Sequence, residues 1–170
     1  MLLALALLLS PGIAFAGAAD ELSALFVQSC LPYAGDPPAL RKWAAHLSLP
    51  EVPDPARASF LNGAPGKVFD ASGATGVRLA LISSDDGICA VITDHAADRE
   101  TVQSLEHTLT EAGATFRLVA ERNDKLNTDL HHREYLAGYK NREWRILAAT
   151  VRDFPPGHSP GQAMLTAGPE

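Results

Sequence analysis

The spacing of hydrophobic positions divides the chain into a helical first part and a mainly β second part. In the first part, apolar residues recur every three to four positions, as they do on the buried face of a helix. Proline and glycine residues interrupt this pattern and set the ends of the expected helices. The pattern predicts three helices, over about residues 21–32, 37–47 and 54–62.

After Gly66 the apolar period changes from about 3.6 residues to two, which is typical of strands with one buried face. Residues 88–93 form a nearly continuous apolar run and are expected to be the most buried strand. An apolar stripe that ends at Gly113 predicts one further helix, over about 99–112. The other strands are expected over about 67–70, 77–82, 115–121, 132–139 and 143–151.

The expected order is therefore three N-terminal helices followed by β-β-β-α-β-β-β. Short connections favour antiparallel pairing, so the predicted fold class is α+β: a mainly antiparallel sheet with a helix on one face. Residues 17–153 are expected to form this single domain, because that length supports one hydrophobic core. Residues 154–170 are rich in proline and glycine and are expected to be a disordered tail.

The first sixteen residues have the pattern of an export signal. An apolar run, Leu2–Leu9, is followed by a helix-breaking step and by the small-x-small sequence Ala14-Phe15-Ala16. Cleavage is expected near Ala16/Gly17, which predicts a periplasmic or secreted protein. The run is shorter than the roughly 20 residues that span a bilayer, and no membrane span is expected in the mature chain.

Composition narrows the class of partner. The 170 residues include 14 Lys+Arg and 20 Asp+Glu, which gives a formal net charge of -6. An acidic chain without a long basic run argues against nucleic acid as a partner. The hydrophobic content of 46% is too high for a disordered protein.

The two cysteines are expected to form a disulfide. Cys30 lies on the apolar stripe of the first expected helix, and Cys89 lies in the most apolar strand. Two buried thiols that meet in an oxidising compartment are converted to a disulfide. The bond would close the loop between Cys30 and Cys89, and the lost chain entropy of the unfolded state would stabilise the fold by about 4 kcal/mol. The alternative is a pair of unbonded thiols in the core.

Histidines and aspartates offer two candidate catalytic pairs, Asp94/His95 and Asp129/His132. The first pair follows the most buried strand, but no nucleophile motif accompanies either pair. His131 and His132 are adjacent, and adjacent residues of a strand point to opposite faces, so they do not suit one metal ion. We therefore expect neither a metal site nor a cofactor. A small periplasmic enzyme such as a hydrolase, using one of the two pairs, is the alternative hypothesis.

The last predicted hairpin is the best candidate for a contact surface. Arginine and aromatic residues contribute strongly to protein interfaces, and the hairpin carries Arg133, Tyr135, Tyr139, Arg142 and Trp144. The alternative is that its aromatic residues face the core. The favoured function is an exported binding protein that acts on a protein or a cell-envelope component. A further hypothesis is a ligand-binding or sensory module with a small apolar pocket between helix and sheet.

Several features occur together over about residues 20–151. They are an early helical cysteine, the segment Phe60–Gly66 before the first strand, and a Gly-x-Cys-x-Val pattern at Gly87–Val91. Together with the export signal, they make the chain similar to a group of small exported proteobacterial proteins and lipoproteins of unknown function. The resemblance implies a periplasmic location and a paired cysteine, and it implies no particular activity.

Overall fold

The computed structural model describes residues 17–125, 129–151 and 162–169, so the expected export signal lies outside the described residues. The helices are α1 (Ala18–Tyr33), α2 (Pro37–His46), α3 (Asp54–Leu61) and α4 (Asp98–Glu111). The strands are β1 (Gly66–Asp70), β2 (Leu79–Ser84), β3 (Cys89–Thr93), β4 (Thr115–Asn123), β5 (Leu130–Tyr139), β6 (Arg142–Val151) and β7 (Ala163–Gly168).

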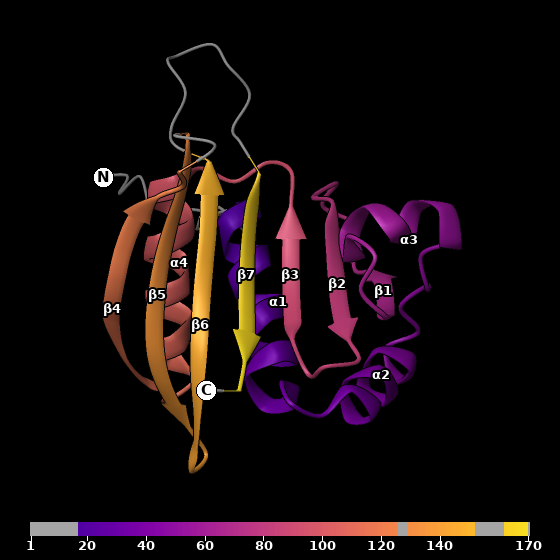
Figure 1. Ribbon diagram of the computed structural model, residues 1–170, viewed down its shortest axis with the longest axis horizontal. Helices are drawn as coiled ribbons and strands as arrows, with labels where there is room; N and C mark the ends of the chain where they lie inside the picture. The colour runs from indigo at the N-terminus through magenta and orange to yellow at the C-terminus, as the bar shows by residue number, and fades with distance from the viewer. Residues whose placement is uncertain (1–16, 126–128, 152–161, 170) are drawn as a thin grey trace, which may run out of the picture.

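The described strands form one sheet in the order β1-β2-β3-β7-β6-β5-β4, and every neighbouring pair is antiparallel (Figure 1). The predicted α+β class is confirmed, with helices first, strands afterwards and α4 between β3 and β4. The loop expected over 122–129 is shorter than predicted, because β4 continues to Asn123 and β5 begins at Leu130.

The expectation of a disordered tail over 154–170 is wrong for residues 163–168. These residues form β7, which lies in the middle of the sheet between β3 and β6 (Figure 1). Ala163, Leu165 and Ala167 alternate along the strand and are completely buried. The prolines and glycines that suggested disorder precede this strand in the sequence. The short stretch of alternating apolar residues after them is therefore enough to form a central strand, because β3 and β6 pair with it on both sides.

The two faces of the sheet are covered differently. On one face, which we call the helix face, α1 and α4 pack over the main core, which includes Phe26, Leu105, Val91, Leu165 and Ile146 (Figure 1). On the other, which we call the open face, a smaller apolar cluster lies near α3. Its buried members are Leu61, Val68, Ala80, Ile82 and Ala90.

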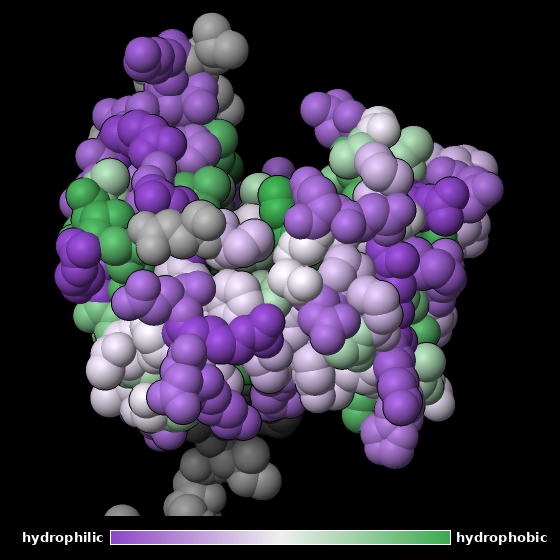
Figure 2. Space-filling model, turned by 60° about the horizontal axis from the view of Figure 1, so that its bottom comes forward, coloured by the Kyte–Doolittle hydropathy of each residue, from purple (hydrophilic) through white to green (hydrophobic). Residues whose placement is uncertain are grey.

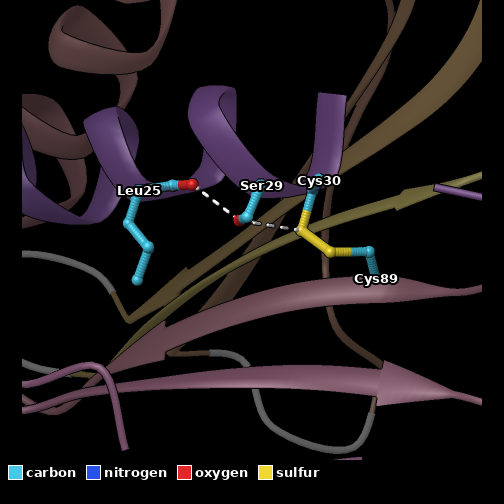
Figure 3. Close-up of a disulfide and its surroundings, with 4 residues drawn as sticks. All are labelled: Leu25, Ser29, Cys30 and Cys89. Atoms are coloured by element: carbon cyan, nitrogen blue, oxygen red, sulfur yellow. Dashed lines mark hydrogen bonds between the residues drawn. A yellow bond between two sulfur atoms is a disulfide. The ribbon is translucent and has the colours of Figure 1, made fainter. Parts of the chain in front are cut away.

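The predicted disulfide is present. Cys30 of α1 and Cys89 of β3 are bonded, with their Cα atoms 5.3 Å apart. Figure 3 shows the Cys30 side chain pointing from the helix toward the strand. The backbone N–H of Gly35 donates to the Gly87 carbonyl at 2.8 Å, which holds the end of α1 against the turn between β2 and β3 a second time. A Cβ atom added at Gly87 would lie 3.0 Å from the Gly35 Cα, so the two backbones approach closely here.

Among the described residues, none of the helices combines the length and the apolar character needed to cross a membrane.

Candidate functional site

A cleft of about 520 Å³ lies on the open face, between α3 and the ends of β2 and β3. A volume of a few hundred cubic ångströms is typical of small-molecule sites. Figure 2 shows the surface hollowed between two raised parts, the right-hand one carrying α3. The apolar walls come from the segment before α3, from α3 and from the strands. They consist of Pro50, Val52, Pro53, Phe60, Leu79, Ala80 and Ile92.

Phe60 is the most unusual of these residues. Its side chain is 38% exposed, whereas the next residue, Leu61, is buried in the cluster beneath α3. A large aromatic side chain left this open at a concave surface is available to a ligand.

Asp94, one of the sequence-predicted candidates, lies at the rim of the cleft. Its carboxylate is 2.7 Å from His95 Nδ1 and also contacts the Arg78 guanidinium. The hydrogen bond from His95 and the positive charge of Arg78 outweigh the effect of burial and hold the pKa of Asp94 below its usual range. The predicted Asp94/His95 contact is therefore present. Because Asp94 also contacts Arg78, it is not free to act on His95 alone.

The cleft has two further carboxylates, and their surroundings differ. Glu51 lies 2.7 Å from Lys67 Nζ and 3.6 Å from Arg57, and the hydrogen bond from Lys67 lowers its pKa. Asp70 accepts a hydrogen bond from the Ser72 backbone N–H at 3.0 Å, and hydrogen bonding by Ser72 lowers its pKa. No cationic side chain among the described residues forms an ion pair with Asp70. Within the part of the chain that the structure describes, Asp70 is therefore an ionised carboxylate without a counter-charge.

The second candidate pair lies elsewhere. His131 and His132 belong to β5 and face opposite sides of the sheet, as their adjacency predicts. His132 Nε2 lies 3.3 Å from Asp124 on the open side. Asp129 is at the turn just before β5. Since β7 and β6 separate β3 from β5, this pair lies three strand spacings, or about 14 Å, from the strand that ends beside Asp94.

His131 belongs to a partly buried ionic cluster on the helix face, which sequence reasoning missed. Asp98, the first residue of α4, accepts hydrogen bonds from Arg133 and Thr150. Glu121 accepts one from Arg133 at 3.0 Å and lies 3.3 Å from His131 Nε2. Burial alone would raise the pKa of Asp98, but the bonds from Arg133 and Thr150 outweigh it and lower the pKa. The cluster fastens the start of α4 to β4, β5 and β6.

Two of the five residues expected to form a contact surface on the last hairpin are buried. Tyr135 and Trp144 are only 1% and 2% exposed, because both side chains point to the helix face. Arg133 is held by Asp98. Tyr139 and Arg142 lie at the end of the hairpin, and the Arg142 guanidinium covers the Trp144 ring, 4.6 Å from its centre. The aromatic residues therefore face the core, which is the alternative that the sequence left open.

The sequence offered a small apolar pocket between helix and sheet as a further hypothesis but did not locate it, because the walls of the cleft come from residues that are distant in the chain. A proline-rich segment, one face of α3 and two strands meet only in the folded protein. The available signal was a phenylalanine after a series of prolines, but a single apolar residue is a weak signal, and the helical pattern placed Phe60 inward.

Comparisons with known proteins add no identity. No family model matches the chain, and no curated protein matches it.

Proposed function

We propose that this is an exported binding protein that holds its ligand in the cleft between α3 and the open face of the sheet. The observation that carries the proposal is the cleft, whose volume of about 520 Å³ and apolar walls suit a small molecule or part of an envelope component. The proposal places the ligand on the open face rather than on the last hairpin, because two of the three aromatic residues of that hairpin, Tyr135 and Trp144, are buried.

Export is supported by the pattern of the first sixteen residues and by the disulfide, since disulfides persist mainly in oxidising compartments. We expect the mature protein to begin at Gly17. Intact mass of the protein recovered from periplasm or medium should show this start. Recovery of the full-length chain from the cytosol alone would contradict export.

Ligand binding in the cleft can be tested with Nile red, an uncharged dye that fluoresces in apolar surroundings. We expect the folded protein to increase its fluorescence, and the variant Phe60→Ala to weaken binding roughly tenfold. The expected loss follows from removing an aromatic ring that a bound ligand would cover, worth about 1.4 kcal/mol. Titration of the dye against each purified protein gives the dissociation constants.

Leu47→Ala provides the matched control. Leu47 is 49% exposed and does not line the cleft, so its removal takes away a comparable apolar side chain elsewhere. Equal weakening by both variants, or no fluorescence increase with the folded protein, would contradict a site in the cleft. Thermal unfolding of both variants verifies that neither loses its fold.

The contact between Asp94 and His95 favours a second candidate function, a small hydrolase. Three features make it the weaker one. Arg78 engages Asp94. Both cysteines are bonded to each other, so there is no thiol nucleophile. The hydroxyl of Ser72, which lines the cleft, accepts a hydrogen bond from the Leu79 backbone N–H at 3.1 Å. This hydroxyl therefore has a structural role at the first residue of β2.

A further inference from the structure

We propose that the ligand of the cleft is a small amphiphilic cation, an apolar body that carries an amine or similar positive group. The inference rests on the proposed function, because it concerns the same cleft. The observation behind it is the charge on the lining. Of its three carboxylates, Glu51 and Asp94 already contact cationic side chains, whereas Asp70 contacts none among the described residues.

Asp70 is also held ready to receive a cation. One carboxylate oxygen accepts the Ser72 backbone N–H, which fixes the side chain at the end of β1. The carboxyl group is exposed, so it keeps its hydration until a ligand arrives, and a cation placed there would pay little for desolvation. The Asp70 carboxylate would repel an anionic ligand, so the cleft should prefer positively charged ligands to negatively charged ones.

The sheet register sets the distance between the charged and the apolar parts of the ligand. Asp70 is paired with Ala80, and Ala80 with Ile92, so the carboxylate, a small apolar residue and a large one form a row across three strands. Adjacent strands are about 4.8 Å apart. An amine on Asp70 would therefore lie about 5–10 Å from the centre of an apolar body that rests on Ala80 and Ile92.

Three compounds with one indole body and different side-chain charge can test this. Tryptamine is cationic, tryptophol is neutral and indole-3-propionate is anionic, and each is used to displace Nile red from the protein. We expect tryptamine to bind about fivefold more tightly than tryptophol, which is the upper range for one exposed ion pair. Indole-3-propionate should bind more weakly than tryptophol, and added salt should reduce the differences.

The variant Asp70→Asn should bring tryptamine to the affinity of tryptophol and leave tryptophol unchanged. Asp86→Asn is the matched control, because Asp86 also accepts a backbone N–H two residues further on, from Ile88, but lies outside the cleft lining. Its expected effect is none.

The outcomes separate the two proposals. If Nile red binds in the cleft but tryptamine binds no better than tryptophol, or if none of the three compounds displaces the dye, the cationic ligand is wrong and the cleft site stands. If Nile red does not bind, or if Phe60→Ala and Leu47→Ala weaken its binding equally, the cleft site fails as well. A tryptamine preference that survives Asp70→Asn would also overturn the assignment of this carboxylate.

Discussion

Deletion of residues 163–168 is expected to unfold the protein. β7 pairs with β3 on one side and with β6 on the other, so it joins two three-stranded halves of the sheet. Without it, β3 and β6 would be about 10 Å apart, twice the spacing at which strands form hydrogen bonds. The loss of both ladders and of three buried side chains exceeds a stability margin of about 5–15 kcal/mol. Circular dichroism and thermal unfolding of the protein without residues 163–168 would measure the loss of folded structure.

A point substitution tests the same strand without removing it. Leu165→Ala empties a fully buried position and should cost about 2–5 kcal/mol of the free energy of unfolding. Met164→Ala is the control, because the Met164 side chain lies on the opposite face of the same strand and is only partly buried. Its cost should be clearly smaller. For the deletion, a protein without residues 163–168 that melts at the same temperature as the full chain would show that β7 is not needed for folding.

Much of the fold was predictable because local patterns agree with the tertiary structure. The apolar stripe of α4 ends at Gly113, and strand alternation separates Ile146 from Leu147, so burial follows the sequence period. β7 escaped prediction for a physical reason. Its buried face consists of two alanines and one leucine, and small residues give a weak hydrophobic signal, although they pack well between two strands that are already in place.

The candidate site was less predictable than the fold, because it depends on which segments meet. Asp94 and His95 are neighbours in the chain, and their contact could be expected from sequence. That Phe60 and Ile92 line one cleft, and that no described cationic side chain forms an ion pair with Asp70, depend on sheet order and on where α3 packs. Sequence reasoning listed Tyr135 and Trp144 as candidates for a contact surface and left open that they face the core. Tyr135 is paired with the buried Ile146, and Trp144 lies two residues before Ile146 on β6, so both side chains share the face of Ile146. Register, once known, assigns them to the core.

The disulfide is the second feature whose removal should have a large effect. It closes a loop between residues 59 apart in sequence, and for a loop of this length chain entropy contributes about 4 kcal/mol. Both cysteines are completely buried in the main core, so alanine at both positions also loses packing of the sulfur atoms. The backbone bond between Gly35 and Gly87 remains, and it should keep the end of α1 near the turn between β2 and β3.

We therefore expect the double variant Cys30→Ala/Cys89→Ala to fold but to lose about 2–5 kcal/mol of its free energy of unfolding. Denaturant unfolding of the wild-type protein and of the variant, each with and without a reductant, measures the loss. The reductant should destabilise the wild-type protein and leave the variant unchanged, because only the wild-type protein has a bond to reduce. Two free thiols in the unfolded, unreduced wild-type protein would contradict the disulfide. Equal stability of the two proteins would show that packing alone holds α1 against β3.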